Sequence, residues 1–207
     1  EFEDLPAKKD DATEIIKLKA SKRLNLNPPD IRLGYQKLSR DGTVKVLAVV
    51  VNKDTVVSCE DACLESGFEV GRISIHSFNL LNLFSQEASV HGICPVIIRL
   101  DDYFSIMFLK NGILDFYRCK VVRGSDGTGT KEISSSFLSY RGKNPDTPLD
   151  NIYLISMSGD FEEMVRKAVG VEVRLFALDT VLKPGPAVPA GQFSLGYLAA
   201  LGAAAGI

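Results

Sequence analysis

The sequence lacks the features that mark several common classes of protein. It contains two histidines and four cysteines, and no two cysteines form a Cys-x-x-Cys pair, so a zinc site is not expected. Its net charge of −2 provides no overall basic field for nucleic acid. No uninterrupted apolar run is long enough to span a membrane, and no secretion signal is recognised. The free cysteines therefore fit a reducing cytosol.

What is present is an ordinary globular composition with a β-rich centre. Hydrophobic residues make up 45% of the chain and charged residues 24%, as in typical globular domains. Asn111-Gly112 separates two apolar runs and predicts a hairpin, because a type I′ turn needs a positive φ at both central positions. Three runs rich in β-branched and aromatic residues predict strands of a meander, over 96–100, 103–109 and 113–121.

Strands and helices alternate along the rest of the chain. Asp10 or Asp11 is expected to cap the first helix, and residues 46–51, apolar on both faces, are expected to lie centrally in a sheet. Helices are predicted over 11–24, 54–66, 77–84, 131–141, 161–169 and 191–204. Strands are predicted over 31–38, 43–52, 70–75, 151–157 and 171–176. This order predicts an α/β fold with a mixed sheet.

Four groups of residues, in this order, match one known family. They are 19–24 with 30–38; 46–52 with 54–66, 67–70 and 73–84; 110–112 with 116–118; and 151–160 with 171–173 and 195–206. Together they resemble PilM, the actin-like protein of the type IV pilus assembly platform. PilM shares its fold with the cell-division protein FtsA and with the cytoplasmic part of the type II secretion protein GspL. The resemblance covers nearly the whole chain.

The resemblance implies an actin-like (ribonuclease H-like) ATPase fold with a mixed sheet flanked by helices. The fold is expected to be incomplete, because nothing in the sequence matches the hairpin and first phosphate-binding loop with which the family begins. Four parts are implied. They are a small inserted FtsA-like subdomain (1–68), a return to the first lobe (69–92), a second lobe with the meander (93–176), and a C-terminal segment whose helix packs back on the first lobe (177–207).

The resemblance also implies where a nucleotide would bind. Active members of the family have an Asp-x-Gly turn followed by small hydroxyl residues, because a phosphate needs close approach to backbone N–H groups. Here Asp101-Asp102 occupies that turn, the glycine is absent, and Tyr103-Phe104 replaces the hydroxyl residues. Asp101-Asp102 is thus expected to be a plain polar turn, crowded by aromatic rings, and the alternative is that Asp101 is a vestigial cofactor-binding residue that holds the metal.

A second vestigial contact is expected at Ser158-Gly159, which matches the family's adenosine-side turn. That turn usually reads Ser-Gly-Gly, and Asp160 replaces its last glycine, where it would cap a helix and repel phosphate. The glycine-rich stretch 124–131 lacks the spacing of a P-loop and is expected to be a mobile linker.

The remaining candidate groups favour no reaction. His76 and His91 are isolated, and no serine or cysteine has a recognisable base partner, so neither a catalytic residue nor a metal ligand is predicted. The first helix is expected to have an apolar side and a basic side. The basic side is expected to be solvated, with acidic lipid headgroups or a partner tail as the alternative. The apolar residues are Ile15, Ile16, Leu18 and Leu24, and the basic ones are Lys17, Lys19, Lys22 and Arg23.

The resemblance implies an adaptor on the cytoplasmic side of the bacterial inner membrane, peripheral to it. The adaptor would bind the cytoplasmic tail of a PilN-like membrane protein, by strand addition or apolar anchors, and would meet the assembly motor ATPase indirectly. No nucleic acid and no cofactor are expected; ATP with magnesium would bind only in the full-length protein. The alternatives are an active actin-like ATPase completed by a missing N-terminal part, and a GspL-type structural domain of a secretion platform.

Overall fold

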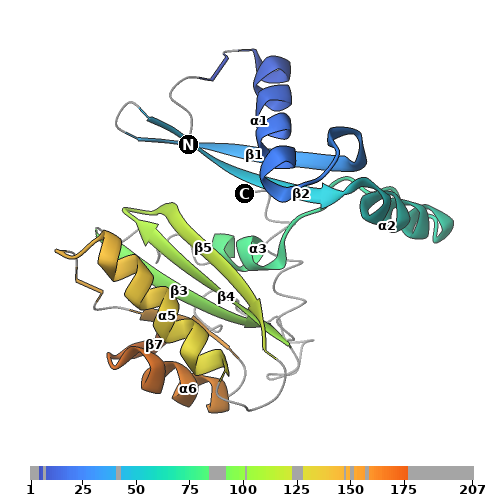
Figure 1. Ribbon diagram of the computed structural model, residues 1–207. Coiled ribbons are helices and arrows are strands. Elements are labelled where there is room, and N and C mark those ends of the chain that lie inside the picture. Colours follow the sequence, from blue (N-terminus) through green and yellow to red (C-terminus); the bar gives the residue numbers. More distant parts are fainter. Residues whose placement is uncertain are drawn as a thin grey trace. The chain divides into compact units, whose positions relative to one another are not determined.

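The chain divides into two compact units, Glu1–Ile73 and Ser74–Ile207, in a computed structural model (Figure 1). The structure describes residues 5–6, 8–40, 43–83, 92–100, 102–122, 128–146, 148–149, 152–156 and 159–176. Several predicted features lie outside these residues, namely the helix over 191–204, His91, Asp101, Ser158 and the first half of the glycine-rich stretch, 124–127.

The first unit is built on a β-hairpin. β1 (Ile31–Arg40) and β2 (Thr43–Asn52) pair antiparallel along their whole lengths. α1 (Lys9–Leu24) is joined to β1 by the short 3-10 helix η1 (Pro28–Asp30). α1 buries Ala12 and Ile16, and these residues pack with Leu5 against partly buried side chains of the hairpin. The hairpin side chains are Leu33, Tyr35, Val44 and Val46.

Two predictions for the first unit are wrong. Lys8 is the N-cap of α1 and makes no side-chain cap, so Asp10 and Asp11 lie in the first turn, where they complement the positive end of the helix dipole. Residues 46–51 do not lie centrally in a sheet, because the described residues of this unit form a sheet of two strands, each of which is an edge.

α2 (Lys53–Glu65) follows β2 directly. The Asn52 side chain accepts a 2.8 Å hydrogen bond from the Asp54 N–H and caps the helix. The sequence favoured Asp54 or Thr55 as the cap, two or three residues later, and this prediction is wrong. Gly67 takes a φ of 80° just beyond the C-terminus, as helix ends favour. The strand predicted over 70–75 is not formed. Among the described residues it has no neighbouring strand, and an extended segment needs one for its backbone hydrogen bonds.

The second unit contains a five-stranded mixed sheet, which confirms the predicted mixed sheet. The strand order is β5-β4-β3-β6-β7. β3, β4 and β5 form an antiparallel meander, and β6 and β7 continue the sheet parallel to β3. Asn111 and Gly112 have φ values of 48° and 76°, which confirms the predicted turn. The strands are β3 (Ile93–Leu100), β4 (Tyr103–Lys110), β5 (Ile113–Val121), β6 (Ile152–Ile155) and β7 (Val173–Leu175).

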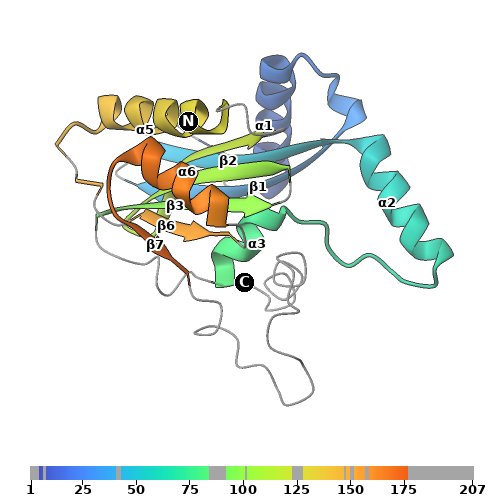
Figure 2. The same cartoon turned by 90° about the horizontal axis from the view of Figure 1, so that it is seen from below.

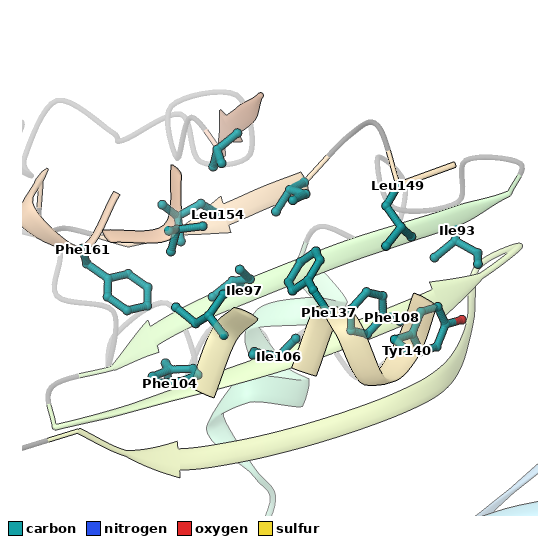
Figure 3. Packing of buried hydrophobic residues seen from close by; sticks show 14 of the residues in the cluster. Ile93, Ile97, Phe104, Ile106, Phe108, Phe137, Tyr140, Leu149, Leu154 and Phe161 are labelled. Carbon is teal, nitrogen blue, oxygen red and sulfur yellow. The ribbon is translucent and has the colours of Figure 1, made fainter. Parts of the chain in front are cut away.

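Helices cover both faces of this sheet (Figure 2). α5 (Thr128–Lys143) and α6 (Gly159–Val169) lie on one face, over a large aromatic and aliphatic cluster that Figure 3 shows from close by. α3 (His76–Leu83) lies on the other face, where Leu80 packs with Val96, Ile98 and Met107. Because both faces are covered, β3 is apolar at nearly every position.

The glycine-rich stretch is in part a helix rather than a linker. Residues 128–131 form the first turn of α5. Gly129 is buried there, and a Cβ at this position would lie 2.8 Å from the Sδ of Met164 in α6. The missing side chain therefore lets α5 and α6 approach closely.

Candidate functional site

The candidate site is the edge of the five-stranded sheet where β3 and β6 end. β3 and β6 are parallel neighbours, with Ile98 opposite Ile155, so their C-terminal ends lie at the same edge. β3 leads there into the turn to β4, and β6 leads toward α6. Ligands of open α/β sheets bind beyond the carboxyl ends of parallel strands. In the sequence, Asp101 follows β3, and Ser158-Gly159 follow β6.

The β3–β4 turn is a two-residue connection. Leu100 pairs with Tyr103, which leaves Asp101 and Asp102 between the strands. The Asp102 side chain is exposed, and its backbone carbonyl accepts a 2.6 Å hydrogen bond from the Val122 N–H. The end of β5 thus restrains the turn. Because Asp101 lies outside the described residues, its role stays a prediction.

Tyr103 and Phe104 contribute to clusters on opposite faces of the sheet. Phe104 is fully buried beneath α6, and its ring centroid lies 5.9 Å from that of Phe161. Tyr103 is half-buried and packs against the cluster under α3. The prediction that the Phe104 ring crowds the turn is therefore wrong. Successive side chains of a strand point to opposite faces, and Phe104 points into the core.

The N-terminus of α6 lies beyond β6 and carries acidic residues. Gly159 is its first residue and is exposed, and Ser158 lies outside the described residues. Asp160 and Glu162 lie in the first turn, where the helix dipole favours negative charge. Arg166 donates to Glu162 at 2.8 and 2.9 Å and holds that carboxylate one turn along the helix. An anion approaching this end would meet the exposed carboxylate of Asp160.

Arg99 is a site residue that the sequence reasoning missed. It is the penultimate residue of β3, and its guanidinium carbon lies 5.2 Å from the ring centroid of Phe161 in α6. A cation over an aromatic face is held by the ring quadrupole. Its charge could have identified Arg99 in the sequence, because it is the one charged residue in an otherwise apolar strand. This edge thus holds a positioned cation together with the exposed carboxylates of Asp102 and Asp160.

Among the described residues, the other reactive groups form no metal-binding centre at this edge. In the part of the chain that the structure describes, no three His, Cys, Asp or Glu side chains are placed to hold a metal ion. His76 begins α3 and is exposed. Cys94 is buried in β3, and burial raises the pKa of its thiol to about 11.

The described helices include none long and apolar enough to cross a membrane.

The prediction that α1 has an apolar side is largely wrong. Ile16 is 2% exposed, whereas Ile15, Leu18 and Leu24 are 43%, 49% and 53% exposed. On the basic side, Lys19, Lys22 and Arg23 are exposed and Lys17 is half-buried. The two-stranded hairpin covers only the face that carries Ala12 and Ile16.

Comparison with solved structures identifies the fold. The structure of a PilM–PilN type IV pilus biogenesis complex matches with a TM-score of 0.71 and 14% identity, over 96% of this chain and 70% of that chain. A protein from Bacteroides thetaiotaomicron VPI-5482, described as having an actin-like ATPase fold and unknown function, matches with a TM-score of 0.53 and 16% identity, over 79% of this chain and 60% of that chain. No protein-family model matches the sequence, and a search of curated proteins found no match.

These likenesses define a class of fold. The chain has a mixed α/β architecture of the actin-like ATPase type, as the sequence predicted. The resemblance to PilM in particular is confirmed at the level of the fold.

Proposed function

We propose that this chain is a PilM-like adaptor of the type IV pilus assembly platform at the inner membrane. The observation that carries the proposal is the likeness to the PilM–PilN complex, which extends over 96% of the chain and therefore includes both units. In this proposal residues 1–68 are the inserted subdomain, 69–92 return to the first lobe, 93–176 form the second lobe and 177–207 pack back on the first lobe. The adaptor acts on the cytoplasmic side and is peripheral to the membrane.

The proposed ligand is the cytoplasmic tail of a PilN-like membrane protein. The neighbour's structure contains PilM together with PilN, which supports a partner of this kind. A short tail binds such a protein by adding a strand to an exposed sheet edge or by placing apolar anchors in a groove. The chain would then pass the state of the assembly motor ATPase to the membrane protein without touching the motor itself.

Co-purification tests the partner. A synthetic PilN-like tail peptide, immobilised through its C-terminus, is expected to retain the chain, and a scrambled peptide of the same composition serves as the control. Retention by the native-order peptide alone is the predicted result. Equal retention by both peptides, or by neither at saturating peptide density, would contradict the proposed function.

We also propose that nucleotide binding has degenerated. The turn after β3 has no glycine for close phosphate approach, and Asp160 replaces a glycine at the start of α6. The alternative is an active actin-like ATPase, which the fold of the second neighbour favours. Binding of ATP with magnesium is measured by the longest natural form of the protein and by its Asp101→Ala variant. Micromolar affinity that Asp101→Ala abolishes would establish the alternative; no binding by either protein is expected.

A further inference from the structure

The last turn of α1 is open to solvent on every side. Ser21 is the last buried side chain of the helix, and every residue from 22 to 27 is exposed. Because an α-helix completes a turn in about 3.6 residues, consecutive exposed residues point in all directions around its axis. This end of α1 therefore projects from the part of the helix that Ala12 and Ile16 pack on the hairpin.

The projecting end carries exposed leucines. Leu24 and Leu26 are 53% and 44% exposed, and Leu18, which precedes the last turn, is 49% exposed. With Ile15, they make four large aliphatic side chains exposed within residues 15–26, and no other stretch of twelve described residues exposes as many. Single exposed apolar side chains are ordinary, whereas a concentration of them marks a contact surface.

The backbone at this end is held by hydrogen bonds. Asn25 has a left-handed conformation with a φ of 54°, and the Leu26 N–H donates a 3.0 Å hydrogen bond to the Ser21 carbonyl. In such a Schellman turn, the residue at the position of Leu26 commonly makes an apolar contact with the residue at the position of Ser21. Serine offers no such contact, so the turn holds Leu26 in place and leaves its side chain exposed.

The same end of α1 is positively charged. Residues 15–29 contain four basic residues and no acidic one. Glu14 lies about 12 Å before Lys22 along the helix axis, beyond the Debye length of about 8 Å at physiological salt. Asp30, the next acid along the chain, accepts a 3.0 Å hydrogen bond from Asn27. We call the exposed leucines and cations the basic end of α1. They are Leu18, Lys19, Lys22, Arg23, Leu24 and Leu26.

We propose that the basic end of α1 contacts a lipid surface that carries anionic headgroups. Lysine and arginine are attracted to such headgroups, while leucines beside them reach the boundary between headgroups and acyl chains. A lipid surface can surround a projecting helix end, whereas an acidic protein would have to offer a groove shaped to it. The inference rests on the proposed function for the membrane itself, and it adds a direct lipid contact to the proposed contact with the tail.

The lipid contact is weak and sensitive to salt. A single myristoyl chain binds membranes only marginally, and three half-exposed leucines bury less apolar surface than that chain does. Salt of about 1 M shortens the Debye length to about 3 Å and removes most of the attraction of the cations. Such a contact orients an adaptor that another interaction already holds near the membrane, because tethering raises the effective concentration of the second contact.

A tryptophan reporter tests the position of the contact. The chain contains no tryptophan, so Leu24→Trp places a single fluorophore in the basic end of α1. The full chain is titrated at low salt with vesicles of equal parts phosphatidylglycerol and phosphatidylcholine, and the emission maximum is expected to move to shorter wavelength. Vesicles of phosphatidylcholine alone are expected to leave it unchanged. Leu138→Trp, at a site in α5 that is 69% exposed, is the matched control and is expected to show no shift.

Vesicle flotation tests the two kinds of side chain separately. Variant one carries Lys22→Glu and Arg23→Glu, and variant two carries Leu24→Ser and Leu26→Ser. Each is expected to need at least about tenfold more lipid than the native chain for half of the protein to float. Circular dichroism verifies that each variant keeps its helices.

A control variant with Lys167→Glu and Arg174→Glu changes the net charge as much as variant one does. These two cations are exposed in the second unit, where the exposed acids Glu163 and Glu172 are close to them in sequence. The control is expected to float with the anionic vesicles as the native chain does.

Four results would overturn the proposal. They are an emission maximum of Leu24→Trp that does not move with anionic vesicles at low salt, an equal shift in Leu138→Trp, a folded charge-reversed variant one that floats as the native chain does, and a shift of Leu24→Trp with soluble poly-glutamate as large as that with vesicles. The last result would assign the surface to an acidic protein. The vesicles contain no protein, so failure here is distinguishable from failure of the tail-peptide test.

Discussion

The Tyr140 hydroxyl donates a 2.9 Å hydrogen bond to a carboxylate oxygen of Asp115 and thereby joins α5 to β5. Asp115 is the extra residue of a β-bulge, since Leu109 pairs with Leu114 and Phe108 pairs with Phe116. The bulge lets a polar side chain and the following aromatic ring both face α5. The Tyr140 ring also stacks on Phe108, with centroids 3.9 Å apart and planes 9° from parallel (Figure 3).

Tyr140→Phe is expected to lower the free energy of unfolding by about 1–2 kcal/mol. The substitution keeps the ring contact with Phe108 and removes the donor from the Asp115 carboxylate, so the loss reports the hydrogen bond. Urea denaturation measures it. Tyr117→Phe is the matched control, because its hydroxyl lies at a longer distance, 3.4 Å, from Ser105 and is expected to contribute less. An equal loss in the two variants would contradict this account of the bulge.

Cys94 is expected to react with thiol reagents far more slowly than the exposed Cys59 and Cys119. Burial raises its pKa from 9.0 to about 11, so at pH 8 its thiolate fraction is about one hundredth of that of an unshifted thiol. Labelling at pH 8, followed by mass spectrometry, distinguishes the sites. Cys94 labelling as fast as Cys119 in the native protein would rule out the buried position.

The raised pKa of Cys94 also makes the free energy of unfolding depend on pH in the alkaline range. The folded state holds the Cys94 proton more tightly than the unfolded state, so this contribution is complete below pH 9.0 and is lost as the pH rises toward about 11. Burial and the Asp115 carboxylate raise the pKa of Tyr140 as well, which acts in the same direction above its usual value of 10.0. Unfolding midpoints in urea from pH 8 to pH 11 are expected to fall, and less steeply in Cys94→Ala. Urea midpoints that rise from pH 8 to pH 11 would contradict the raised pKa values of Cys94 and Tyr140.

The pair of buried hydroxyls under α3 is expected to act as one unit. The Oγ atoms of Ser77 and Ser105 lie 2.8 Å apart, and both side chains are buried. Ser105→Ala removes the partner of the Ser77 hydroxyl, whereas Ser77→Ala leaves the Ser105 hydroxyl with its longer contact to Tyr117. Each single change is expected to cost about 1–3 kcal/mol of unfolding free energy, and Ser77→Ala is expected to cost less. The double variant is expected to cost less than the sum of the two single changes, by at least about 0.5 kcal/mol. Strict additivity would show that the two hydroxyls do not interact.

The meander could be predicted because its signals are local. Asn-Gly fixes the turn through its positive φ values, and the apolar runs on each side fix the strands. The start of α1 and the strand over 70–75 could not be predicted in the same way. A helix can begin without a side-chain cap, as α1 does at Lys8, and a strand forms only where another strand offers its edge.

The candidate site could be predicted only in outline. The resemblance indicated the turns after β3 and β6, and the parallel register brings the ends of those strands to one edge. The burial of Phe104 and the position of Arg99 over Phe161 depend on α6, which is distant in sequence. Residue type alone gives neither the face a side chain occupies nor the ring on which it rests.

Thermal unfolding with and without a PilN-like tail peptide tests the central claim most directly. A ligand that binds only the native state at a hundred times its dissociation constant contributes about 2.7 kcal/mol, or a rise of about 5–10 °C in Tm for a chain of this size. The proposed adaptor role predicts a rise of that order with the native-order peptide, without nucleotide, and none with its scrambled control. An unchanged Tm at saturating native-order peptide would contradict it.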